Sequence, residues 1–136
     1  MVDQLDEPWP GTTTLTGSER ADERALLSET GVALMAWSPL AGGFLTSSYQ
    51  PDAKVNVETK RCYDSWDNRS RRENALELAE SRGCTLEQIA IAYAASPLLR
   101  ASVVCAACSG PEAKANVEAV SIQLTDEERR WLEEVD

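Results

Sequence analysis

Histidine is absent from this 136-residue sequence. Its absence removes the side chain that most often acts as a general base and most often binds transition metals in proteins. Basic residues are also scarce, because 13 lysines and arginines stand against 23 aspartates and glutamates and leave a net charge of −10. That charge argues against binding DNA or an anionic membrane surface through bulk electrostatics.

Long apolar runs are missing as well. No stretch approaches about 18 consecutive apolar residues, so we expect no transmembrane helix. The first residues, from Met1 to Pro8, are acidic and lack an apolar core, which is unlike a secretory signal. With 43% apolar residues, the sequence predicts a folded, cytoplasmic protein that binds neither nucleic acid nor membrane.

Four cysteines are present, and Cys105 and Cys108 form a C-x-x-C pattern. A zinc site would need all four to converge because histidine is absent, so we expect no metal site. The pair stands between a predicted strand and a predicted helix start, where a helix dipole stabilises a thiolate, and a thiol–disulfide role is therefore an alternative. We favour the simpler interpretation that both are small residues packed at the end of a strand.

The most informative stretch is 31–45, which reads GVALMAWSPLAGGFL. Its uninterrupted apolar run, Val32–Ala36, predicts a strand that is buried on both faces. Pro39 then prevents further ladder pairing, and Gly42-Gly43 permits a tight turn. Ligands of α/β proteins bind outside the carboxyl ends of parallel strands, so the residues that follow this strand are the first candidate site. The alternative is a plain turn without a ligand.

A second apolar run, Ala101–Ala107, predicts another strand. The helices between the two runs imply a right-handed crossover, which makes the strands parallel. The next helix is expected to begin at Ser109-Gly-Pro-Glu112, because a small polar cap followed by proline is typical of a helix start. Its free N–H groups would lie beyond the second strand and form an anion site.

The other elements are predicted from their start and stop residues. Residues 1–18 predict an irregular lead-in to a domain over 19–136, and 46–67 predict a long loop that folds over a ligand. Capping boxes at Thr85–Gln88 and Thr125–Glu128 each predict the start of a helix. The first of these two helices is expected to end at Pro97. Two further helices are expected, at 19–29 with Ser18 as the cap and at 67–82 with Asp67 or Asn68 as the cap. The last helix is expected to bury Trp131, Leu132 and Val135.

These segments together resemble the aldo-keto reductases, especially the group that includes the potassium-channel β subunits. The stretch 31–45 is similar to the seventh strand of that family and the loop after it. The segments Arg61-Cys-Tyr-Asp-Ser, 74–79 and 85–93 look like its seventh helical segment. The segments 116–120 and 124–128 look like its last barrel helix and C-terminal helix. The match covers about residues 24–134 and keeps the order of the motifs.

The resemblance implies that the chain is the C-terminal portion of a (β/α)8 barrel that moves hydride between NADPH and a carbonyl. This incomplete barrel would hold two parallel strands and four to five helices, with NADP(H) or NAD(H) as the cofactor. The residues implied at the nicotinamide ribose and pyrophosphate are Trp37, Ser38, Pro39, Leu40, Ala41 and Gly42. Ser109 and Asn116 would lie near the adenine end, and Arg61 would reach the cofactor from the loop.

The sequence also departs from the family. The catalytic aspartate, tyrosine, lysine and histidine come from early strands that have no counterpart here, so we expect no catalytic residue. Tyr49, Tyr63 and Tyr93 lie in other segments. The arginine that many members place against the 2′-phosphate corresponds to Glu112, which leaves the choice between NADP(H) and NAD(H) open. Two strands cannot close a barrel, which needs about 250 residues in this fold.

Three hypotheses for function remain. The first is a truncated aldo-keto reductase that is inactive alone, from a truncated gene, a split gene or a fragment. The second is a non-catalytic dinucleotide-binding or interaction module that pairs with itself or with a second chain completing the barrel. The third is a thiol redox protein that uses Cys105 and Cys108.

Overall fold

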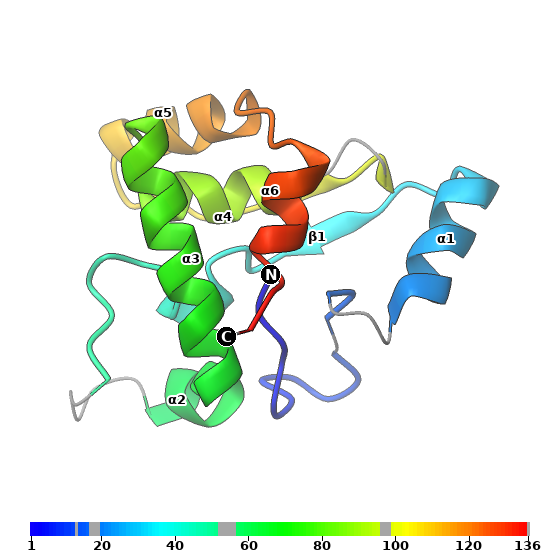
Figure 1. Cartoon of the computed structure of the whole chain (residues 1–136), viewed down its shortest axis with the longest axis horizontal. Helices are drawn as coiled ribbons and strands as arrows, with labels where there is room; N and C mark the ends of the chain where they lie inside the picture. Colours follow the sequence, from blue (N-terminus) through cyan, green and yellow to red (C-terminus); the bar gives the residue numbers. More distant parts are fainter. Residues whose placement is uncertain (13, 17–19, 52–56, 96–98, 136) are drawn as a thin grey trace.

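The computed structural model describes residues 1–12, 14–16, 20–51, 57–95 and 99–135. It is a mixed α/β arrangement, as predicted (Figure 1). The described part of the chain contains six α-helices, and the one beyond the four to five expected is short. In chain order the elements are α1 (Ala21–Thr30), β1 (Met35–Trp37), the 3-10 turn η2 (Ala41–Gly43), α2 (Val57–Tyr63), α3 (Trp66–Arg82), α4 (Leu86–Ala94), β2 (Ser102–Val104), α5 (Gly110–Val120) and α6 (Asp126–Trp131).

The two strands pair in parallel, as predicted. Met35 lies opposite Ser102 and Trp37 lies opposite Val104. Just before the paired segment, the Ser102 amide donates to the Leu34 carbonyl at 2.8 Å. Both strands are shorter than the apolar runs that predicted them, and α2, α3 and α4 lie between them in the chain.

The prediction that the first strand is buried on both faces is wrong for the described chain. Met35 is 72% exposed, Val32 54% and Trp37 44%. A strand is buried on both faces only when other elements cover both sides of its sheet. The described residues supply two strands, and their side chains alternate between more exposed and less exposed positions. The apolar run is therefore typical of a strand that other elements cover, but the described residues do not include elements that cover both of its faces.

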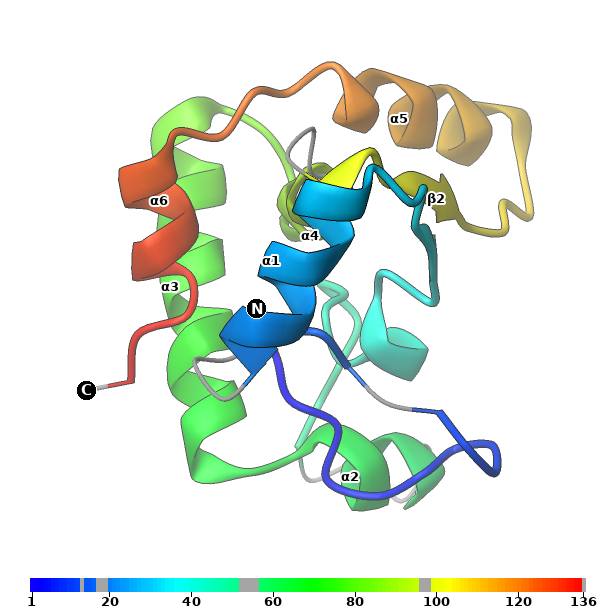
Figure 2. The same ribbon diagram turned by 90° about the vertical axis from the view of Figure 1, so that its right-hand side faces the viewer.

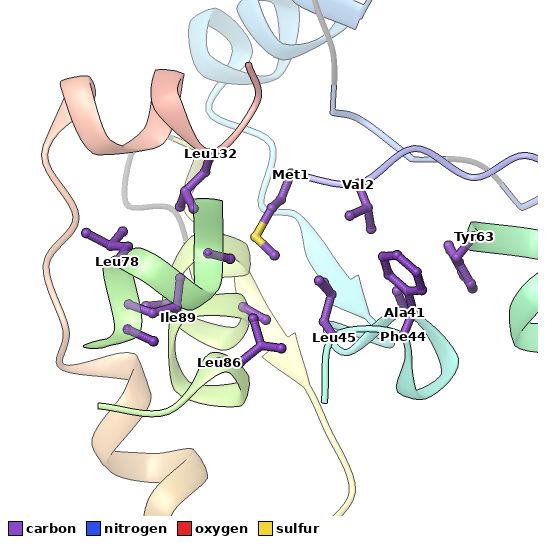
Figure 3. Packing of buried hydrophobic residues seen from close by; sticks show 14 of the residues in the cluster. Met1, Val2, Ala41, Phe44, Leu45, Tyr63, Leu78, Leu86, Ile89 and Leu132 are labelled. Carbon is purple, nitrogen blue, oxygen red and sulfur yellow. The ribbon is translucent and has the colours of Figure 1, made fainter. Parts of the chain in front are cut away.

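The core lies between the helices rather than on the sheet. α4 contacts both α3 and α5. Ile89 of α4, Phe44 after the turn η2 and Leu132 after α6 are all fully buried, at 0% exposure. Figure 3 shows Met1 and Val2 directed into the same cluster, which the sequence did not predict for an irregular lead-in. The division of the chain at residue 18 stays a prediction.

Local signals for helix ends are confirmed. Thr85 Oγ1 accepts from the Gln88 amide at 3.2 Å, and the Gln88 side chain accepts from the Thr85 amide at 3.1 Å. The second capping box, at Thr125, is also present. Gly31 and Gly83 end α1 and α3 in the left-handed conformation, with φ of 65° and 64°, which costs glycine little because it has no Cβ.

Two predictions for the segment before α3 are wrong. Residues 57–63 of the expected loop form α2, whose buried residues Thr59, Cys62 and Tyr63 recur at helical spacing. The cap of α3 is Ser65, whose hydroxyl accepts from the amide of Asn68 at 3.1 Å. Asn68 is instead buried in the third helical position, where its side chain bonds other segments.

The predicted burial of three residues near the C-terminus is confirmed only in part. Leu132 is buried as predicted, Trp131 is half-buried, and Val135 is exposed because it follows the end of α6. The predicted cap Ser18 and helix stop Pro97 lie outside the described residues. Within the described ranges, no helix has the length and apolar character needed to cross a membrane.

Candidate functional site

The carboxyl ends of β1 and β2 lie at one edge of the sheet. Parallel pairing with Trp37 opposite Val104 brings both chain exits to that edge. In Figure 2 the loop after β2 leads up to α5, while the segment after β1 leads down to the turn at 41–43. Edges of this kind are where open α/β sheets bind ligands, so the two loops, 38–43 and 105–109, form the candidate site.

The loop 38–43 has an unusual backbone. Ser38 and Ala41 have φ of 51° and 50°, in the left-handed region that residues with a Cβ seldom adopt. Gly42 follows with φ of 61°. The Ala41 amide donates to the Ser38 carbonyl at 2.9 Å, and the Gly43 amide donates to the Leu40 carbonyl at 3.0 Å. Such backbone outliers concentrate at ligand-binding positions in proteins.

Neighbouring helices hold this loop in place. Thr59 of α2 donates its hydroxyl to the Gly42 carbonyl at 2.7 Å. Arg72 of α3 donates to the carbonyls of Phe44 and Thr46 at 3.0 and 2.9 Å. A Cβ at Gly42 would lie 3.4 Å from the Thr59 hydroxyl and 3.6 Å from a ring carbon of Tyr63. The backbone is therefore fixed from one side by groups that pack closely against it.

The other side of the loop is open. A Cβ placed on Gly43 would meet no atom within 4 Å. The Ser38 hydroxyl makes no hydrogen bond to any residue that the structure describes, and its side chain is half-buried. The loop thus presents a hydroxyl and an approachable backbone, which suits a polar ligand that lies across the strand end.

The second loop is tied to α5 by three side chains. Ser109 caps the helix and accepts from the Glu112 amide at 3.3 Å. The Glu112 carboxylate accepts from the Cys108 amide at 2.6 Å. Asn116 donates to the Ala106 carbonyl at 3.2 Å. A carboxylate of the chain itself therefore already occupies part of the anion site predicted at this helix start.

A cavity of about 770 Å³ adjoins the end of β1. Trp37, Ser38, Pro39 and Ala41 form part of its lining, so the structure brings these predicted residues together. The remaining walls include parts of α1 and α4, several of the described residues before position 17, the rest of β1, and Arg129 and Glu133. Most of the lining is apolar, which is typical of pockets that bind small organic ligands.

The other predicted residues lie apart from that cavity. Leu40 and Gly42 belong to the same loop but not to the cavity wall, and Ser109 and Asn116 lie at the start of α5. Arg61 lies on α2, where it pairs with Asp6 and lies 3.8 Å from a carboxylate oxygen of Glu58. Its guanidinium is directed to these carboxylates rather than to the strand ends.

The three tyrosines are poorly suited to act as general acids. Burial and the carboxylate of Asp64, which accepts from the Tyr49 hydroxyl at 2.9 Å, raise the pKa of Tyr49 to about 12. Burial also raises the pKa of Tyr63. Burial and the carboxylate of Glu133, which accepts from the Tyr93 hydroxyl, raise the pKa of Tyr93. A general acid needs a pKa near the working pH, so these phenols are poorly suited to proton transfer at pH 7.

The cysteines differ from expectation in one respect. Cys105 and Cys108 are exposed, so the interpretation that they pack at a strand end is wrong. The reason is that β2 ends at Val104 and the loop carries both thiols outward. Cys62 is buried, Cys84 is half-buried, and all are free thiols. In the ranges that the structure covers, no group of three or more histidine, cysteine, aspartate or glutamate side chains could hold a metal ion.

Three known proteins are similar in sequence to this chain. A probable voltage-gated potassium channel subunit beta from Arabidopsis thaliana is 32% identical over 109 residues, covering 71% of this chain and 32% of the plant protein. A similarly named rice protein is 33% identical over 109 residues. Versiconal hemiacetal acetate reductase from Aspergillus parasiticus is 28% identical over 129 residues, covering 85% of this chain and 36% of the fungal enzyme.

The chain spans about a third of the length of these relatives. A model of the aldo/keto reductase family matches residues 16–136, which include both strands and every α-helix of the described chain. The parallel β1–β2 pair, with its loops at one edge, agrees with the barrel fold implied by that family. This chain therefore belongs to the aldo/keto reductase family.

Proposed function

We propose that the chain is the C-terminal part of an aldo-keto reductase barrel and holds a nicotinamide dinucleotide, without transferring hydride on its own. The observation that carries this proposal is the parallel pairing of β1 and β2, which brings the loops 38–43 and 105–109 to one edge. Family membership makes a dinucleotide the expected ligand of such an edge. When bound, that cofactor supplies or accepts the hydride exchanged with a carbonyl carbon.

The donor set of the first loop fits such a ligand. In our proposal the Ser38 hydroxyl and the open backbone at Gly43 contact the ribose and pyrophosphate. Trp37 and Pro39, which line the cavity, supply an apolar wall for the nicotinamide side. Leu40, Ala41 and Gly42 shape the turn that holds these groups.

The adenine end would lie against Ser109 and Asn116 at the start of α5. Both side chains already bond the protein itself, Ser109 to the Glu112 amide and Asn116 to the Ala106 carbonyl. They would therefore position the loop as well as contact the ligand. Arg61 would reach the cofactor only after leaving Asp6 and Glu58, so its role stays a prediction.

Catalysis by this chain alone is not expected. The sequence has no histidine, and the resemblance places the whole catalytic tetrad in strands absent from these residues. The tyrosines have raised pKa values, as described above. We propose that activity requires the remaining strands of a barrel, supplied by a longer polypeptide or by a second chain.

A fluorescence titration of the purified chain with NADH and NADPH tests the binding step. Saturable quenching of tryptophan emission is expected, and Trp37→Phe should remove most of it because Trp37 lines the cavity. Trp66→Phe is the matched control, since Trp66 lies on α3 and is 76% exposed. Ser38→Ala should weaken binding about five- to tenfold, the effect of one lost hydrogen bond, whereas Ser48→Ala should not.

Absence of quenching in a chain with an intact near-ultraviolet circular dichroism spectrum would refute cofactor binding. Turnover is tested separately by following NADPH absorbance with simple aldehydes. No oxidation above the blank is expected. Steady turnover by the purified chain would overturn the proposal that it is non-catalytic.

A thiol–disulfide function is a second candidate because Cys105 and Cys108 are both exposed and close in sequence. The two thiols would be oxidised to one disulfide while a disulfide of a second protein is reduced to two thiols. An exchange assay with a model disulfide tests this. Activity that survives alkylation of both cysteines would refute it.

A further inference from the structure

We infer that Glu112 is a specificity-determining residue that directs this site toward a dinucleotide without a 2′-phosphate, that is, NAD(H) rather than NADP(H). The inference rests on the proposed function, because it concerns the adenine end of the same site. It departs from the NADPH use that the family resemblance implies. Its basis is the position, hydrogen bonding and charge surroundings of one carboxylate.

Glu112 is held firmly in the first turn of α5. Its Oε2 accepts from the Cys108 amide at 2.6 Å, and its own amide donates to the Ser109 hydroxyl at 3.3 Å. The backbone and the side chain of Glu112 are thus both bonded to the loop 105–109. The favourable end of the helix dipole adds to this hold, because a carboxylate is stabilised at a helix N-terminus.

Among the residues that the structure describes, Glu112 forms no salt bridge with a lysine or arginine. Lys114 is the single basic residue of α5, and its ammonium lies 3.6 Å from a carboxylate oxygen of Glu118. Arg100, before β2, donates to the Gly31 carbonyl, beyond the opposite end of the two strands. Over residues 101–120 the sequence holds one lysine, no arginine and two glutamates. A ligand that reaches the start of α5 therefore meets net negative charge.

A 2′-phosphate is the wrong group for these surroundings. A phosphate monoester carries a charge of about −1.5 to −2 at pH 7 and accepts hydrogen bonds. To use the helix start it would have to displace the Glu112 carboxylate from the Cys108 amide, and otherwise it would lie beside a like charge. Both arrangements weaken binding.

A ribose with a free 2′-hydroxyl has the opposite interaction. The hydroxyl donates to a carboxylate, which is how acidic residues recognise the unphosphorylated ribose in dinucleotide-binding folds. Glu112 Oε1 makes no hydrogen bond to any residue within the described ranges, so it can accept one while Oε2 keeps the Cys108 amide. The same residue therefore favours one cofactor and disfavours the other.

Isothermal titration calorimetry of the full 136-residue chain with NADH and with NADPH measures the two dissociation constants and so tests the inference. NADH is expected to bind about tenfold more tightly, which corresponds to about 1.4 kcal/mol. Raising the salt concentration to about 0.5 M should shrink the ratio, because the repulsive part is screened. Glu112→Gln keeps the size of the side chain and an acceptor for the Cys108 amide, and it should bring the ratio to about twofold or less.

Glu118→Gln is the matched control. It removes one negative charge from the same helix, at an exposed position beside Lys114, and should leave the ratio unchanged. Equal affinity for both cofactors, tighter binding of NADPH, or an unchanged ratio in Glu112→Gln would overturn the role of Glu112 while leaving the proposed binding function intact. Failure of a folded chain to bind either nucleotide would overturn the proposed function and this inference with it.

Discussion

The side chain of Asn68 connects three segments of the molecule, and its removal gives a sharp test of how the fold is held. Asn68 is fully buried, at 0% exposure. Its Nδ2 donates to the carbonyls of Asp3 and Tyr63 at 2.7 and 2.8 Å. Its Oδ1 accepts from the Asp3 amide at 2.8 Å and from Arg71 at 3.2 Å. One amide thus joins the N-terminal segment, the end of α2 and the start of α3.

Asn68→Ala should lower the free energy of unfolding by about 3–4 kcal/mol. The substitution removes three hydrogen bonds to backbone groups, and each such bond contributes about 1 kcal/mol net. It also leaves one amide and two carbonyls without their side-chain partner, which adds to the loss when those groups stay buried. For a chain of this size the change corresponds to a melting temperature lower by about 10 °C.

Urea unfolding followed by circular dichroism measures this change. Asn116→Ala is the matched control, because the Asn116 side chain donates one hydrogen bond, to the Ala106 carbonyl at 3.2 Å, at the surface. The control should cost about 1 kcal/mol or less. If Asn68→Ala costs no more than Asn116→Ala, the N-terminal segment is not held by Asn68 and the reasoning fails.

Two further predictions concern the core and the response to pH. Leu132→Ala should cost about 2–5 kcal/mol in the same unfolding assay, since Leu132 is fully buried, whereas Val135→Ala should stay within about 0.5 kcal/mol. The pKa of Tyr49 is raised to about 12 in the folded state, so its contribution is complete below pH ~10, the ordinary pKa of tyrosine, and is lost as the pH rises toward 12. Tyr49→Phe should reduce this alkaline loss of stability, and an unchanged pH profile would contradict that assignment.

Several helix boundaries are predictable because their causes lie within a few residues. The capping boxes at Thr85 and Thr125 need only a hydroxyl and a side chain three positions later. The glycine stops at Gly31 and Gly83 depend on the backbone freedom of one residue. The cap at Ser109 follows from the same local chemistry. The cap of α3 is an exception, because Ser65 bonds an amide only three positions later, yet the sequence favours Asp67 or Asn68 as the cap.

Burial was harder to predict because it depends on distant partners. The run beginning at Val32 is apolar, yet the described chain has nothing to cover one face of its strand. Met1 is buried by side chains that come much later in the sequence. The sequence does not predict the helix Val57–Tyr63, although its buried positions have helical spacing, because no capping box or apolar run marks its start.

The sequence identifies the loop after the first strand as the first candidate site, and the role of its residues in binding stays a prediction. Trp37, Ser38, Pro39 and Ala41 lie at or after the end of the predicted strand, and in the structure they form part of the wall of one cavity. The bond between Glu112 and the Cys108 amide was not predicted, although a glutamate in the first turn of a helix is a signal for it. Arg61 was assigned by resemblance, and its pairing with Asp6 depends on residues 55 positions away.

The connection between β1 and β2 sets an order of events in folding. Met35 and Ser102 pair across roughly half of the chain, so closing that loop costs more entropy than joining α3 to α4 through Gly83. The α3–α4 hairpin should therefore form first, and the strands should pair last. Until they pair, the apolar segment around Met35 has unpaired backbone N–H and C=O groups on both sides, where a strand of another molecule can bind. Refolding yield should consequently fall as protein concentration rises, because strand association between molecules then competes with pairing within one.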